Sequence, residues 1–142
     1  MRAEMLKSAN SANGITAAQA QCYADRVVDG VGVAALQRGG QIDKAGNATD
    51  STSGPAHLNF SKTDASTIVN AAFGCFNTAA LMNQIRSGID HGMQRASTAT
   101  TACVNHKLTE SLVKQIMAAQ FSGGIANTPL GATLTGILRG CR

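Results

Sequence analysis

The sequence predicts an all-α fold of about five helices, on three observations. Five stretches carry apolar residues at the three- and four-residue spacing of one helix face. A side chain that commonly caps helices precedes each stretch, and none shows the strict apolar–polar alternation of a half-buried strand. A hydrophobic fraction of 44% with only 14% charged residues indicates a packed core rather than a disordered chain.

The first predicted helix runs from residue 17 to residue 37. Thr16 precedes it and Gln19 follows three positions later, which is the spacing of a capping box. Gly30 and Gly32 interrupt its middle, and a glycine inside a helix costs about 1 kcal/mol relative to alanine. We therefore expect a kink or a break there. The residues expected to face the core are Cys22, Val27, Val28, Val31, Ala35 and Leu36.

The second and third helices are expected to follow Ser61 and Thr78, which we interpret as their N-caps. The inward residues predicted for the second helix are Ile68, Val69, Ala72, Phe73 and Phe76. The third helix is expected to carry Leu81, Met82, Ile85, Ile89 and Met93 on one face, and the four-residue intervals from Leu81 to Met93 make this the most regular stripe in the chain. Such a stripe is typical of a core-facing side.

The fourth helix is expected to begin after Ser97 or Thr98 and to continue to Phe121, where Gly123 and Gly124 end it. The fifth begins after Thr128 and extends to the end of the chain. Pro129 fits its first helical position, where a missing N–H is harmless. Between the first two helices, residues 38–60 are rich in Gly, Ser, Thr, Asn and Asp, which predicts a long connecting loop.

The 142 residues are enough for one domain or two small repeats. We predict a flexible segment over 1–14, one helical repeat over 15–77 and a second over 78–142, packed together as one domain. In each repeat a cysteine lies near the start of a longer helix that ends in Gly-Gly, and a second cysteine ends a shorter, capped helix.

The four cysteines predict two disulfides, because their number is even and no two have the spacing of a zinc or thioredoxin motif. Consecutive helices tend to pack antiparallel, which brings Cys22 to Cys75 and Cys103 to Cys141. Disulfides persist in oxidising compartments, so we expect a secreted or cell-surface protein. The segment MRAEMLKSAN has no apolar signal core, so we presume that a signal peptide has been removed. The alternative is a cytosolic protein with four buried thiols.

The sequence resembles small exported helical proteins of high-GC Gram-positive bacteria. The residues that support the resemblance are CYADRVVDGVG over 22–32, Leu36, DASTIVNAAFGC over 64–75, and then Cys103, Leu108 and Cys141. The second half lacks the Val-Gly segment of the first. The resemblance implies a helical, disulfide-tied, exported domain and supplies no catalytic residues.

The positive charge lies in the second half. Residues 1–80 hold six cations and six carboxylates, whereas residues 81–142 hold six cations against Asp90 and Glu110. An excess of cations favours nucleic acid, anionic lipid or an acidic partner, and the alternative is an ordinary solvated surface. The binding residues we predict are Arg86, Arg95, Lys107 and Lys114. We expect no nucleic-acid partner, because the cations are scattered and the few aromatic side chains belong to the core.

We predict no enzyme, no metal site and no cofactor. The sequence contains none of the common catalytic or phosphate-binding motifs. Asp25 and Asp29 share one helix face, which we interpret as a polar outer surface. No stretch is long and apolar enough to predict a transmembrane segment. The sequence therefore predicts a non-catalytic exported or cell-surface module that binds a protein or a cell-surface polymer. The alternative is a saposin-like carrier of a small apolar ligand or lipid, since methionine and phenylalanine side chains could line a cavity.

Overall fold

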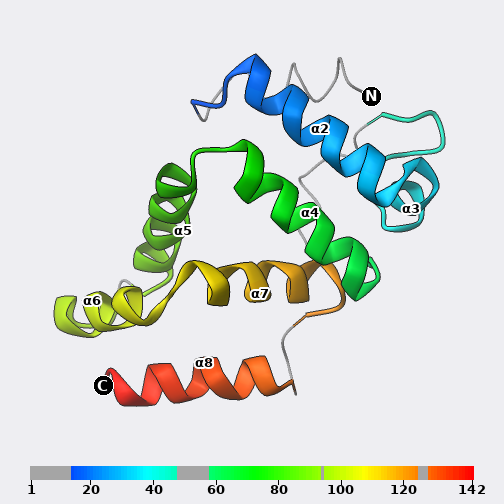
Figure 1. Cartoon of the computed structure of the whole chain (residues 1–142). Coiled ribbons are helices and arrows are strands. Elements are labelled where there is room, and N and C mark those ends of the chain that lie inside the picture. The colour runs from blue at the N-terminus through cyan, green and yellow to red at the C-terminus, as the bar shows by residue number, and fades with distance from the viewer. Residues whose placement is uncertain (1–13, 48–57, 94, 125–127) are drawn as a thin grey trace.

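The computed structural model describes residues 14–47, 58–93, 95–124 and 128–142. Within these ranges the fold is all-α, as predicted, with seven helices and no strand. The helices are α2 (Ala17–Val31), α3 (Val33–Arg38), α4 (Lys62–Cys75), α5 (Thr78–Gly92), α6 (Thr98–Lys107), α7 (Glu110–Phe121) and α8 (Pro129–Gly140). Helix α4 packs against both α2 and α7 (Figure 1). The predicted flexible segment 1–14, apart from Gly14, and residues 48–57 of the predicted loop lie outside the described residues.

The structure has seven helices rather than about five because two predicted helices are divided. The break between α2 and α3 falls at Gly32, whose φ of 85° suits glycine, so the expected break is confirmed there. The single helix predicted from Ser97 to Phe121 is wrong. It ends at Lys107, Leu108 turns into the core, and the Thr109 hydroxyl accepts a hydrogen bond from the Leu112 N–H at 3.3 Å to begin α7. Glu110 then lies in the first turn of α7, where the helix dipole favours a negative charge.

Most of the predicted capping residues are confirmed. Thr16 and Gln19 form the full capping box, with N–H···O distances of 2.9 and 3.2 Å. The other confirmed N-caps are Ser61, Ser97 and Thr128. Thr78 as a cap is wrong, because Asn77 accepts the hydrogen bond from the Ala80 N–H at 3.0 Å and asparagine caps a helix at least as well as threonine.

Helices α2 and α4 approach closely over a first hydrophobic cluster. We call it the first cluster; its buried members are Val27, Leu36, Ile42, Phe60, Ala65, Ile68 and Ala71. Gly30 permits this approach, because a Cβ there would lie 2.6 Å from Cγ2 of Thr67 on α4. Beside Gly74 on α4, the guanidinium end of the flexible Arg26 side chain from α2 occupies the space of a Cβ. Gly30 is therefore a packing residue rather than a site of helix breakage.

A second cluster joins α4 to the rest of the chain. We call it the second cluster; its buried members are Val69, Phe73, Met82, Val104, Leu108, Val113 and Cys141. Its surroundings are mostly only half-buried, including the stripe of α5 that the sequence predicted as core. Of that helix only Met82 is buried, whereas Leu81, Ile85, Ile89 and Met93 pack at the edge of the cluster.

Both predicted disulfides are present. Cys22 is bonded to Cys75 with a Cα–Cα distance of 5.7 Å, and Cys103 to Cys141 with 5.6 Å. All four cysteines are therefore paired, and none is a free thiol. Two disulfides indicate an oxidising environment. The tandem-repeat organisation over 15–77 and 78–142 stays a prediction.

The first disulfide lies beside an aromatic contact. Tyr23 and Phe76, the neighbours of Cys22 and Cys75, have ring centroids 5.2 Å apart. Burial raises the pKa of the Tyr23 phenol, an effect that its hydrogen bond with Gln41 partly offsets.

None of the described helices is on its own long and apolar enough to span a membrane. By length and composition alone, α4 and α5 taken together could do so, with a bend of 116° between them.

Candidate binding surface

Among the described helices, α8 is the one with no buried residue of its own. Thr128 caps it, with its hydroxyl accepting from the Gly131 N–H at 3.2 Å, and Pro129 occupies its first turn. No residue of α8 itself is buried, although Leu134 and Ile137 pack against the second cluster. Leu138 is 45% exposed, a value matched among large apolar side chains of the described residues only by Val33. The apolar face of α8 is thus only partly covered.

Helix α6 meets the end of α8 through the second disulfide. Cys103 lies in α6, and Cys141 directly follows α8 and is buried. The bridge joins the middle of α6 to the residue that follows α8. Lys107 Nζ lies 3.2 Å from the position that a Cβ on Gly140 would occupy. Tertiary structure therefore places the Lys107 ammonium beside Gly140, which directly follows Arg139 and precedes Arg142 by two positions, more than thirty positions later in the chain.

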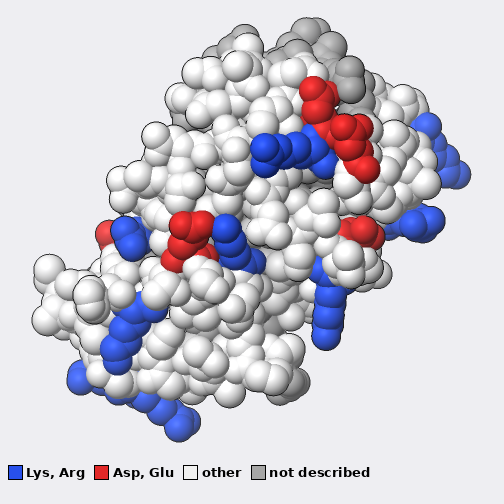
Figure 2. Space-filling model, viewed as in Figure 1, with Lys and Arg blue, Asp and Glu red and all other residues white. Residues whose placement is uncertain are grey.

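Three exposed cations gather where α6 and α8 meet. We call this surface the cationic end; it consists of Lys107, Arg139 and Arg142. The sequence has no Asp or Glu between Asp90 and Glu110 or after Glu110, so neither α6 nor α8 contributes a carboxylate. Figure 2 shows Lys and Arg side chains at the lower left, over the region where Figure 1 places α6 and the end of α8, with no Asp or Glu visible among them.

Of the four predicted binding residues, only Lys107 belongs to the cationic end. Lys114 lies on α7, pairs with Glu110 at 2.8 Å, and stands 5.0 Å from the centroid of the Phe73 ring. Arg86 is half-buried on α5, and Arg95 is exposed in the connection between α5 and α6.

Sequence reasoning missed Arg139 and Arg142 as partners of Lys107. One signal could have found them, namely the absence of any carboxylate over 111–142. Combined with the correctly predicted pairing of Cys103 with Cys141, that signal would have placed the end of α8 beside α6.

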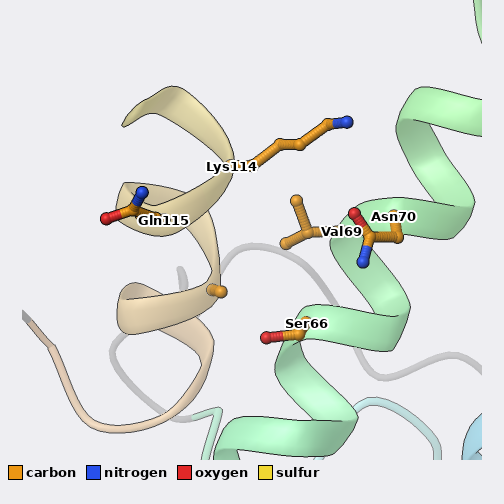
Figure 3. Close-up of a pocket in the computed structure, with 6 residues that line it drawn as sticks. Ser66, Val69, Asn70, Lys114 and Gln115 are labelled. Atoms are coloured by element: carbon orange, nitrogen blue, oxygen red, sulfur yellow. The ribbon is translucent and has the colours of Figure 1, made fainter. Parts of the chain in front are cut away.

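A shallow pocket lies between α4 and α7 (Figure 3). Its volume is about 100 Å³, and its lining is formed by Ser66, Val69, Asn70, Lys114, Gln115 and Ala118. Figure 3 shows the Lys114 side chain extending from α7 toward α4. Pockets that enclose a drug-sized ligand measure roughly 300–1,000 Å³, so this one is too small for an apolar carrier site.

The carboxylates and histidines do not converge in the described part of the chain. No group of three or more His, Cys, Asp or Glu side chains there could hold a metal ion. The Gln21 amide donates to both carboxylate oxygens of Asp25, each at 2.9 Å. On α5, Asp90 accepts a hydrogen bond from the Asn105 side chain at 2.7 Å, which links α5 to α6.

The described parts of the 38–60 segment, residues 38–47 and 58–60, are folded against the core. Ile42 and Phe60 belong to the first cluster, and the Phe60 N–H donates to the Phe121 carbonyl at 2.9 Å. The Asn47 N–H donates to Asp43 Oδ1 at 2.9 Å. This backbone hydrogen bond lowers the pKa of Asp43, and the Asn47 side chain adds to the effect.

Comparison of the chain with family models, curated proteins and solved structures finds no match.

Proposed function

We propose that this chain is a non-catalytic, exported binding module that holds an acidic macromolecular partner at its cationic end. The two disulfides support export, because such bonds persist in oxidising compartments. The observation on which binding depends is the gathering of Lys107, Arg139 and Arg142 without a carboxylate from α6 or α8.

Electrostatics support an acidic partner. A group of cations with no interspersed anions produces a positive local potential, which attracts and orients an anionic surface. The ammonium of Lys114, by contrast, is already paired with Glu110 and lies against Phe73, so it offers less charge to a partner.

The first test uses immobilised dextran sulfate as an acidic probe. The variant combines Lys107→Glu, Arg139→Glu and Arg142→Glu, and the control combines Arg38→Glu, Lys44→Glu and Lys62→Glu, exposed cations of the first half. Both change the net charge equally, and both alter a cation in the last turn of a helix.

We expect the first variant to lose retention and the control to keep most of it. The slope of log affinity against log salt concentration should fall by about one for each contacting cation removed. Equal losses in the two triple variants would contradict the proposal, since only net charge would then matter.

The carrier of an apolar ligand or lipid remains a second candidate, favoured by one observation. Met93 and Met117 lie half-buried around the second cluster beside the buried Met82, and methionine adapts to varied apolar ligands. Mass spectrometry of lipids that co-purify with the folded chain tests it. A stoichiometric bound lipid would favour the carrier over the surface-binding module.

A further inference from the structure

An exposed apolar side chain stands within the cationic end. Leu138 is 45% exposed and immediately precedes Arg139 near the end of α8, and Arg142 follows the C-cap residue Cys141. A soluble polyanion would be bound by the cations alone. A large exposed leucine among cations instead matches a surface that is anionic outside and apolar beneath, as a bilayer with acidic headgroups is.

The helix that bears Leu138 has few other attachments. Gly131, Gly136 and Gly140 lower its intrinsic helix stability, each by about 1 kcal/mol relative to alanine. None of its own residues is buried, and Cys141 at its end ties it to α6. The outer flank of α8 is therefore open to a partner without disturbing the packed helices α2 and α4.

We infer that the cationic end, together with Leu138, docks on an anionic lipid surface. Lys107, Arg139 and Arg142 bind the headgroups, and Leu138 inserts among the upper acyl carbons. This inference rests on the proposed function and specifies the acidic partner as an anionic lipid surface. The protein lies on the membrane rather than crossing it.

The test is sedimentation with vesicles of phosphatidylglycerol mixed equally with phosphatidylcholine, and with vesicles of phosphatidylcholine alone. We expect binding only to the mixed vesicles. Leu138→Ser should weaken it about fivefold, because only the exposed 45% of the Leu138 surface can newly enter the apolar layer. Val33→Ser is the matched control, since Val33 is equally exposed but lies on α3, and it should leave binding unchanged.

The cations are tested in the same assay. Replacing Lys107, Arg139 and Arg142 by glutamine should weaken binding roughly a hundredfold, because each cation near an anionic surface contributes about a fivefold gain.

Tryptophan fluorescence provides a second test that does not depend on the folding of Leu138→Ser. The chain contains no tryptophan, so Leu138→Trp and Val33→Trp each introduce a single reporter. We expect mixed vesicles to shift the emission of the first to shorter wavelength and to leave the second unchanged.

The outcomes separate this inference from the proposed function. Binding to dextran sulfate without binding to vesicles would overturn the lipid surface and retain an acidic partner. Binding to neither probe would overturn both. Equal effects of Leu138→Ser and Val33→Ser would remove Leu138 from the contact.

Discussion

Each half of the chain ties two helices together with one disulfide, yet the packing around the two bridges differs. Around Cys22–Cys75, helices α2 and α4 approach closely because Gly30 leaves room for Thr67, and α4 buries six of its own residues. Around Cys103–Cys141, α8 buries none. The first bridge reinforces an interface that is already packed, whereas the second holds a helix with little else to fix it. The open helix also bears the exposed Leu138 and Arg139, and the exposed Arg142 follows its end.

The largest expected effects come from removing each disulfide by paired Cys→Ala substitution. The two bridges close loops of similar length, with sequence separations of 53 and 38 residues. Because the entropy lost on closing a loop depends weakly on its length, removing either bridge should lower the free energy of unfolding by about 4 kcal/mol. The local consequences should differ. In the variant without Cys103 and Cys141, α8 should lose its protection from amide hydrogen exchange. In the variant without Cys22 and Cys75, α2 should keep most of its protection. An α8 that stayed as protected as α2 would show that its partial packing is sufficient.

Two glycine-to-alanine substitutions should change the free energy of unfolding in opposite directions, which sharpens the comparison between the two halves. Gly30→Ala places a Cβ against Thr67 and should lower the unfolding free energy by about 1 kcal/mol, since the clash outweighs the better helix propensity. Gly136→Ala meets nothing within 4 Å and should raise it by up to about 1 kcal/mol. Chemical denaturation measures both. If Gly30→Ala were as stabilising as Gly136→Ala, the close approach of α2 and α4 would be wrong.

The smallest expected effect is a pH dependence confined to the first half. Burial raises the pKa of Tyr23 in the folded chain, so the unfolded chain loses this proton first as the pH rises. The free energy of unfolding should therefore decrease above about pH 10, the ordinary pKa of tyrosine. The decrease should stop once the pH is high enough for the phenol of the folded chain to ionise as well. Tyr23 is the single tyrosine, so ultraviolet titration reports it directly. Tyr23→Phe should remove this part of the decline, and an unchanged decline would assign it to other groups.

Local signals in the sequence predicted much of the first half. Thr16 and Gln19 define a capping box within four residues, and Gly32 breaks the helix by its own backbone preference. The disulfide pairing also followed, because antiparallel packing of neighbouring helices restricts which cysteines can meet.

The second half was less predictable because its features depend on tertiary packing. The break before α7 had a local signal in Thr109 and Glu110 that the continuous apolar pattern concealed. The regular stripe of α5 showed which face is apolar but not how deeply it is covered. The cationic end joins Lys107 to residues at the end of α8, a proximity that no single sequence window contains.

The most direct test of this account is hydrogen–deuterium exchange of the whole chain with and without dextran sulfate in solution. We expect the probe to slow exchange in α6 and α8 and to leave α2 and α4 unchanged, because the cationic end lies where α6 and α8 meet. Slower exchange centred on α2 and α4, or no change in any helix, would contradict the assignment of the second half as the binding surface.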